Sequence, residues 1–264
     1  MNNFGWIPPT DEKRIQNERY LVRSILRAPL TVEKELAYPK EFNYDQISGS
    51  CTGYSASWAQ SIYNNKKYNG MWLYRRAQDT DGDPNTKDDN DGGYIWAVFD
   101  TLKREGHALW NTETPIKDEG ILSYYWCKTV DDVRAAIDSD RVPVFGIYWY
   151  SNFNKPWPKA ATGELWIGEG TWGQILGGHA IACIAASDKR QAFKLLNTWG
   201  SDYPPVWISY KSITRLLGYQ GECAVGMDIP AVPEPEPEPE EDSIILSGID
   251  ALGKKWSGTL ERVK

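Results

Sequence analysis

The hydrophobic period changes near the middle of the chain, and this change limits the folds it can adopt. From residue 51 to about 139, apolar residues recur at helical spacing, as Tyr54, Trp58 and Ile62 do. From 142 to about 228, the pattern is that of β-strands. The predicted strands are 142–150, 180–186, 192–196 and 206–210. Helices followed by strands are typical of an α+β fold, so we expect two lobes with a cleft between them.

Two helix ends are also predicted by local signals. Ile95, Phe99 and Leu102 lie on one face of a helix that should end at Gly106, because glycine is common just after a helix. The segment 129–132 has the sequence of a capping box, so a short helix should begin there.

Composition excludes several classes of protein. With 41% hydrophobic and 25% charged residues, the chain of 264 residues is neither disordered nor collagen-like. Its aromatic content of 13% favours a tryptophan-rich core over a groove for extended polymers. The net charge of −7 and the lack of a basic stripe argue against nucleic-acid and membrane-surface binding. No apolar stretch approaches the roughly 18 residues of a membrane span. No signal peptide is recognisable, so a cytoplasmic location is expected.

A stretch of alternating proline and glutamate divides the chain. Residues 231–242 should form an extended, self-repelling linker between a domain at 1–230 and a tail at 243–264. The tail is too short to bury a core of its own. It should therefore dock on the domain, pair with a protein partner or stay loose, and a β-hairpin is one form open to it.

The number and spacing of the cysteines and histidines argue against a metal site and against a disulfide framework. Four cysteines are widely and irregularly spaced, which favours free thiols. With two histidines and no CxxC motif, zinc is not expected, and no cofactor is implied. The acidic segment 79–91 has oxygen ligands at alternate positions, as calcium requires. However, Pro84 stands where an EF-hand loop needs glycine, and Asn90 where it needs glutamate, so a solvated loop is favoured.

Three residues have the pattern of a nucleophile with its base. Cys51 follows small residues at the start of a predicted helix, where the helix dipole should lower the pKa of its thiol. His179 follows two glycines that leave room for the imidazole, and it should open a strand. Asn197 ends the next strand, where its side-chain oxygen can accept the imidazole N–H and Trp199 can shield that bond. His107 is expected only in a turn after Gly106.

Over roughly residues 5–228 the chain resembles the papain-like cysteine peptidases. The resemblance rests on four segments in order: 46–51, 91–96, 178–181 and 197–200. The opening residues 4–8 are similar to the start of bacterial-type members that lack a long inhibitory prosegment. The resemblance implies a papain-like α+β fold with a helical N-terminal lobe, an antiparallel β-rich C-terminal lobe and the active site in the cleft.

The resemblance also implies catalytic roles. Cys51 would be the nucleophile, His179 the base and then the acid, and Asn197 the residue that orients the imidazole. Gln46 would donate its amide to the oxyanion together with the Cys51 backbone N–H. Gln46 lies five residues before Cys51, where the family usually has six.

The substrate is expected to be a polypeptide. By the same resemblance, Gly92 and Gly93 would pair with its extended backbone, while Tyr94 and Ala180 would line the pocket for the second residue before the cleaved bond. The function implied is a cysteine endopeptidase with a thioester acyl-enzyme intermediate.

Two other functions stay open at the level of sequence. One is an interaction or structural protein on a peptidase scaffold, tethered through residues 243–264 and associated with a particle or virion. The other is a cell-wall amidase or acyl transferase that uses the same three residues.

Overall fold

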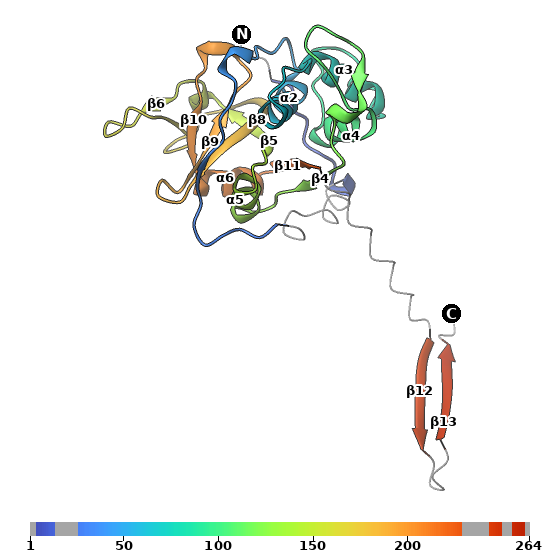
Figure 1. Ribbon diagram of the computed structural model, residues 1–264. Coiled ribbons are helices and arrows are strands. Elements are labelled where there is room, and N and C mark those ends of the chain that lie inside the picture. Colours follow the sequence, from blue (N-terminus) through green and yellow to red (C-terminus); the bar gives the residue numbers. More distant parts are fainter. Residues whose placement is uncertain (1–3, 14–25, 229–242, 250–254, 262–264) are drawn as a thin grey trace. The chain divides into compact units, whose positions relative to one another are not determined.

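The computed structural model describes residues 4–13, 26–228, 243–249 and 255–261 (Figure 1). The chain divides into two compact units, 1–231 and 232–264. In the second unit β12 (Ser243–Ile249) and β13 (Lys255–Glu261) form an antiparallel pair. The predicted linker, 231–242, lies outside the described residues.

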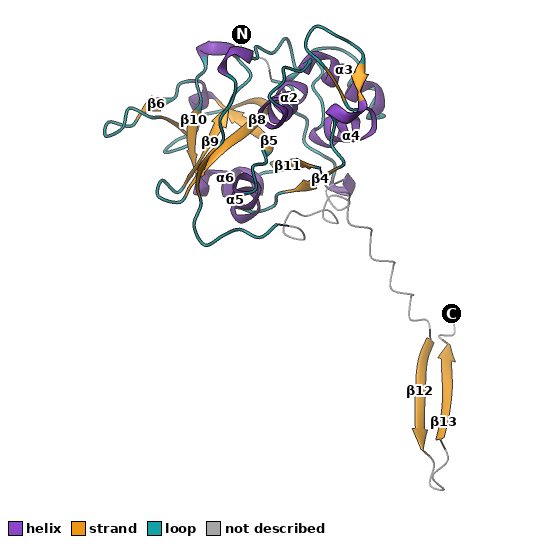
Figure 2. Ribbon diagram, in the orientation of Figure 1, coloured by secondary structure: helices purple, strands orange, loops and turns teal. Residues whose placement is uncertain are grey.

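The α-helices described in the first unit, α2 to α6, form two groups. The first is α2 (Cys51–Asn64), α3 (Gly70–Thr80) and α4 (Ile95–Glu105), and the second is α5 (Val130–Asp138) and α6 (Tyr210–Gly218). Figures 1 and 2 show α2, α3 and α4 gathered on one side of the sheet, with α2 packed on β8 and α5 beside α6. In the described part of the chain, none of the helices is long and apolar enough to cross a membrane.

One large sheet has the strand order β4-β11-β5-β8-β9-β10-β7-β6, and β1 also pairs with β8. Its strands are β1 (Glu33–Glu35), β4 (Ser123–Trp126), β5 (Val144–Tyr150), β6 (Trp157–Pro158), β7 (Leu165–Ile167), β8 (Ile175–Ser187), β9 (Ala192–Leu196), β10 (Val206–Ser209) and β11 (Glu222–Met227). All of these pairs are antiparallel except β7 with β10. A separate small sheet joins β2 (His107–Ala108) to β3 (Pro115–Ile116).

This architecture confirms the α+β prediction, and the local helix signals behave as expected. Gly106 ends α4 with a φ of +87°, a conformation that glycine adopts without strain. Thr129 and Asp132 form the capping box of α5. The expectation for His107 is wrong: it lies not in a turn but in β2, where it is buried and its ring stacks on Tyr68 with centroids 4.5 Å apart.

Two boundaries differ from the prediction. Strand β8 begins at Ile175, not at residue 180, because Gly177 and Gly178, which usually weaken strands, continue the pairing with β5. Tyr210 was predicted to end a strand and is instead the first residue of α6. The Ser209 hydroxyl caps this helix by accepting from the Ser212 N–H, and this local signal was missed.

Aromatic side chains fill much of the core. Trp126, Trp149 and Trp166 are among the largest fully buried residues.

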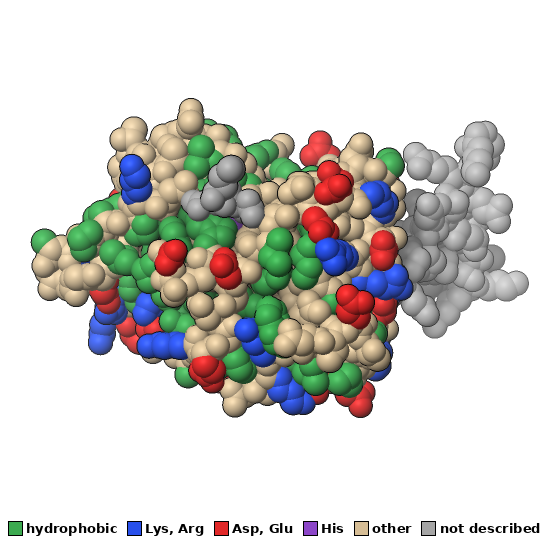
Figure 3. Space-filling view, turned by 90° about the horizontal axis from the view of Figure 1, so that it is seen from above, with side chains coloured by type: hydrophobic (Ala, Val, Ile, Leu, Met, Phe, Trp, Pro, Cys, Tyr) green, Lys and Arg blue, Asp and Glu red, His purple; other side chains and the backbone are tan. Residues whose placement is uncertain are grey.

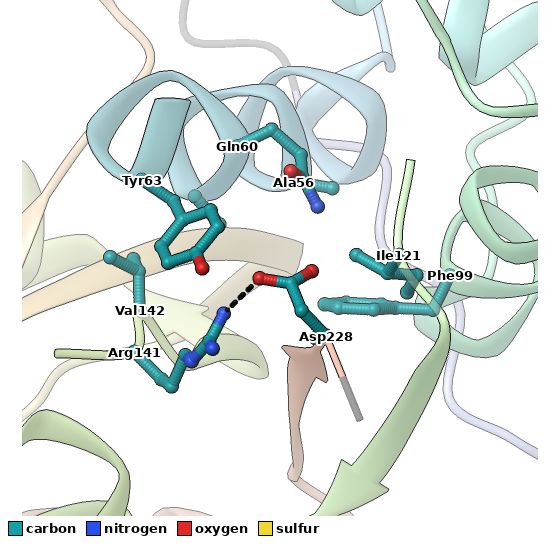
Figure 4. Close-up of a pocket in the computed structure, with 10 residues that line it drawn as sticks. Ala56, Gln60, Tyr63, Phe99, Ile121, Arg141, Val142 and Asp228 are labelled. Carbon is teal, nitrogen blue, oxygen red and sulfur yellow. Dashed lines mark hydrogen bonds and ion pairs between the residues drawn. The ribbon is translucent and has the colours of Figure 1, made fainter. Parts of the chain in front are cut away.

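On the face seen in Figure 3, Lys and Arg side chains are interspersed with Asp and Glu rather than gathered by sign. At the end of β11, Asp228 forms an ion pair with Arg141 at 2.8 Å, beside a pocket that Tyr63 and Gln60 of α2 line (Figure 4).

The Asp188 carboxylate joins three parts of the chain that are distant in sequence. It accepts the Val32 N–H at 2.7 Å, an Arg134 N–H of α5 at 2.6 Å and the Tyr210 hydroxyl of α6 at 2.9 Å. Burial alone would raise the pKa of Asp188, but these three donors outweigh it and hold the pKa below its ordinary value.

We expect Asp188→Ala to lower the free energy of unfolding by about 2–4 kcal/mol at neutral pH, because it removes the less exposed of the two carboxylates that pair with the largely buried Arg134. The contribution of Asp188 is present above the ordinary carboxyl pKa and is lost as the pH falls through its lower folded-state value. Urea unfolding at several pH values measures it. Asp131→Ala is the control, since Asp131 also pairs with Arg134 but its side chain is 70% exposed. An equal loss in both variants would contradict the assignment.

Candidate active site

Cys51 is the first residue of α2, as predicted, and it lies against β8. Its Sγ accepts a hydrogen bond from the Ala180 N–H at 3.3 Å. Ala180 directly follows His179, so the packing of α2 on β8 brings the candidate nucleophile and base together across 128 residues of sequence. The site is therefore assembled by contacts between the two lobes.

The His179 imidazole is held by Asn197, the residue after β9. His179 Nε2 and Asn197 Oδ1 are 2.9 Å apart, and the same oxygen accepts the Thr198 N–H at 2.7 Å. Because the Thr198 N–H can only donate, the atom it meets is the amide oxygen, and the imidazole must donate from Nε2. In the neutral ring Nδ1 is then the acceptor. Among the described residues, it has no hydrogen-bond partner. This is the tautomer that can take a proton from a thiol.

Aromatic rings enclose the imidazole. The ring centroids of Trp199 and Trp149 lie 4.6 Å and 4.9 Å from that of His179, and Phe4 meets it edge-on at 6.1 Å. Trp199, which the sequence analysis expects beside the His179–Asn197 bond, thus packs against the imidazole.

Burial determines the charge of the site in this conformation. Cys51 and His179 are both 0% exposed. Burial raises the pKa of the Cys51 thiol to about 12, against the opposing effect of nearby backbone N–H groups. Burial likewise lowers the pKa of His179 to about 4, although the Asn197 hydrogen bond opposes this. The prediction of a lowered thiol pKa is therefore wrong for this conformation, since desolvation exceeds the effect of the helix N-terminus.

The cover over Cys51 is residues 4–7, which we call the N-terminal strap. The N–H groups of Gly5 and Trp6 donate to the Gly178 carbonyl at 2.9 and 3.0 Å. On the other side, the Gly93 N–H donates to the Gly5 carbonyl at 2.6 Å, and the Ile7 N–H donates to the Gly93 carbonyl at 3.0 Å. The strap is thus bound as an extended strand between the Gly-Gly segment and the residue before His179.

Glycines allow this close approach. A Cβ on Gly5 would lie 1.6 Å from the Gly49 carbonyl oxygen, and one on Gly92, where φ is +89°, would lie 2.4 Å from the Gly5 oxygen. A Cβ on Gly177 would meet Phe4, and one on Gly178 would meet the Trp6 backbone. The room at these two glycines is used by the strap, whereas the sequence analysis assigned it to the imidazole.

The remaining predicted residues lie around the same site. Ala180 and Tyr94 both pack in the core cluster that contains Trp6 and Cys51. The Tyr94 hydroxyl donates to Asp83 at 2.7 Å, and Tyr94 is the N-cap residue directly before α4. These positions place both residues beside the strap.

Gln46 is buried near the start of α2. Its amide nitrogen donates to the Ser48 carbonyl at 3.1 Å, and its amide oxygen accepts from the Thr198 hydroxyl. Ser48 has a φ of +55°, which tightens the turn between Gln46 and Cys51. Thr198 adjoins Asn197, so Gln46 is linked to the segment that holds the imidazole.

Many carboxylates of the acidic segment 79–91 accept hydrogen bonds from within the segment, while Asp89 pairs with Arg75 of α3. Asp81 accepts from the Thr86 hydroxyl at 2.6 Å, Asp83 from Asn85, and Asp91 from the backbone N–H groups of residues 87 and 88. Within the described ranges, no three His, Cys, Asp or Glu side chains are grouped so that they could hold a metal ion.

The strap itself was missed as part of the site. Residues 4–8 were noticed only for their resemblance, and Glu222, which accepts the Trp6 indole N–H at 2.8 Å, carried no signal. These two residues are 216 positions apart, and no local pattern relates them.

Solved structures with a similar fold are cysteine proteases. Xylellain, a cysteine protease from Xylella fastidiosa, aligns with a TM-score of 0.61 and 18% identity over 86% of this chain and 96% of its own. Procathepsin B S9 from Trypanosoma congolense aligns with a TM-score of 0.56 and 12% identity over 86% and 83%. No protein-family model matches the sequence. No curated protein sequence matches it either. The chain therefore has the papain-like two-lobe fold.

We expect Trp6→Ala to expose Cys51. Replacing a buried tryptophan costs about 3–5 kcal/mol, so the strap should open far more often and iodoacetamide should label Cys51 at least about 10-fold faster. Hydration favours the thiolate, so the apparent pKa of labelling should also fall. Mass-spectrometric mapping over a range of pH measures both.

Trp110→Ala is the matched control, because Trp110 is 38% exposed and lies outside the strap. Equal Cys51 labelling rates in the wild type and the Trp6→Ala variant would show that the strap does not limit access to the thiol.

Proposed function

We propose that this protein is a cysteine endopeptidase that hydrolyses polypeptides through Cys51, His179 and Asn197. The observation that carries the proposal is the hydrogen bond from His179 Nε2 to Asn197 Oδ1, with Cys51 Sγ held at the neighbouring Ala180. The papain-like fold supports it, since the similar solved structures are cysteine proteases.

The chemistry follows from the tautomer of His179. After the strap has left, Nδ1 takes the thiol proton, and the thiolate sulfur attacks the peptide carbonyl carbon. The carbonyl oxygen becomes an oxyanion, which the Cys51 backbone N–H and the Gln46 amide would stabilise. The imidazolium then gives its proton to the leaving amine, and a thioester remains on Cys51. Water, deprotonated by Nδ1, hydrolyses the thioester and returns the thiol.

The strap supports a polypeptide substrate. Gly93 uses both its N–H and its carbonyl to bind extended backbone, and Gly178 supplies a further acceptor. A substrate strand would use the same groups. The Gly5–Trp6 peptide bond of the strap is not presented to the thiol, because the Gly5 carbonyl accepts the Gly93 N–H and the Gly5 N–H lies near Cys51.

We expect a peptide library to be cleaved by the wild-type chain or by its Trp6→Ala form, and not by the same chain carrying Cys51→Ala. His179→Ala should lower kcat/KM by about 10³ or more, because a positioned acid–base group contributes about 10²–10⁴. Asn197→Ala should lower it by only about 10- to 100-fold, since the imidazole remains but is less well oriented. Cleavage that survives Cys51→Ala would contradict the proposal.

Gln46→Ala tests the oxyanion assignment separately. Loss of one oxyanion donor typically lowers kcat by about 10²–10³, with KM little changed. Thr198→Val is a useful control. It keeps the Gln46 side chain and removes only the Thr198 hydroxyl that donates to the Gln46 amide oxygen. Undiminished turnover in Gln46→Ala would remove Gln46 from the mechanism without affecting Cys51 or His179.

A further inference from the structure

Helix α3 packs against the start of α2 and reaches the Gly-Gly segment, Gly92 and Gly93, that binds the strap. Tyr74, in the middle of α3, lies against Gly53, two residues after Cys51, because a Cβ on Gly53 would be 2.7 Å from the Tyr74 Cβ. Tyr74 is 0% exposed, and its ring lies beside Gly93, where an added Cβ would be 3.4 Å from Cε2. One buried side chain thus lies between the helix that carries the nucleophile and the segment that binds the strap.

The polar backbone groups of Gly92 are directed at α3. The Gly92 N–H donates to the Tyr74 hydroxyl at 3.0 Å. The Gly92 carbonyl accepts from the Tyr74 hydroxyl at 3.1 Å and from the amide nitrogen of Gln78 at 2.9 Å. Gln78 is also buried, and it follows Tyr74 by four residues, so both side chains lie on the same face of α3. Because a carbonyl can only accept, the atom of Gln78 that faces Gly92 is the amide nitrogen.

Tyr74 and Gln78 are also bonded to one another. Gln78 Nε2 donates to the Tyr74 hydroxyl at 2.8 Å and to the Asp88 carbonyl at 2.9 Å. The Tyr74 oxygen therefore accepts two hydrogen bonds, which uses both of its lone pairs. Its single proton is left for the carbonyl groups of Gly92, Asp88 and Asp89, which lie 3.1, 3.3 and 3.2 Å away. A buried polar network of this kind makes the backbone that it binds rigid.

With both groups of Gly92 bound to α3, the groups of the next residue bind the strap instead. The Gly93 N–H donates to the Gly5 carbonyl at 2.6 Å, and the Gly93 carbonyl accepts the Ile7 N–H at 3.0 Å. The direction of the Gly93 groups thus depends on the two side chains that fix its neighbour.

We propose that Tyr74 and Gln78 are positioning residues that hold Gly92 so that Gly93 is aligned to bind extended peptide backbone. The proposal rests on the proposed function, because it assigns the support of the segment that would bind the substrate. Both residues act through Gly92, whereas Gly93 makes the hydrogen bonds to the bound strand.

The test compares an extended peptide substrate with a short ester that has the same residue at the cleaved bond and no residue before it. Only the extended substrate reaches Gly93. In the full-length Trp6→Ala chain, Tyr74→Phe and Gln78→Met should each raise the KM of the extended peptide about 5- to 30-fold, because Gly92 loses a hydrogen bond and is held less firmly. Its kcat, and both constants for the short ester, should stay within about 3-fold of their values in the parent chain.

Thr101→Val is the matched control. Thr101 is 0% exposed, as Tyr74 is, but its hydroxyl donates to the Ala97 carbonyl at 2.9 Å within α4. The substitution removes a buried hydrogen bond away from Gly92, so KM should be unchanged for both substrates. Equal losses for the short and the extended substrate in Tyr74→Phe, or an equal rise of KM in Thr101→Val, would indicate a general loss of structure and overturn the inference.

A second measurement requires no catalysis. In the chain with its own strap, Tyr74→Phe and Gln78→Met should raise the rate at which iodoacetamide labels Cys51 about 5- to 30-fold, since Gly93 holds the strap by two hydrogen bonds. Faster labelling in these variants but not in Thr101→Val supports the inference even if no variant cleaves a peptide, and in that case only the peptidase proposal fails. Unchanged labelling together with an unchanged KM for the extended peptide would overturn the inference and leave the peptidase proposal standing.

Discussion

The packing of helix α2 on strand β8 is the contact on which the site depends. Strand β8 lies at the centre of the sheet, with β5 on one side and β9 on the other, and it carries both His179 and Ala180. Helix α2 presents Cys51 from its first residue. Cys51 and His179 come from different lobes, so the relative position of one helix and one strand defines the chemistry.

The strap then changes the electrostatics of the pair that this packing creates. A thiol at a helix N-terminus next to an imidazole would ordinarily favour the thiolate. With the strap in place, both groups are buried and neither charge is solvated, so burial favours the neutral forms. Access and reactivity are therefore controlled together by the same few residues.

Local sequence signals predicted the parts of the site that local structure creates. The start of α2 at Cys51, the capping box at Thr129 and the position of Asn197 after β9 all depend on residues within one turn or strand. The contacts of Phe4 and Trp6 join the first residues to β8 and β11, and no periodicity relates such distant positions. The pKa of Cys51 was predicted wrongly for the same reason, since the residues that bury it lie elsewhere in the chain.

The strap belongs to the same chain as the site it fills, and this has a kinetic consequence. A tethered ligand competes at a fixed effective concentration, on the order of millimolar for short flexible connections, however dilute the protein is. The apparent affinity for any substrate is reduced by the fraction of molecules in which the strap is away. Dilution would therefore not activate such a protein. A high local density of substrate would do so, as would anything that holds residues 4–7 elsewhere.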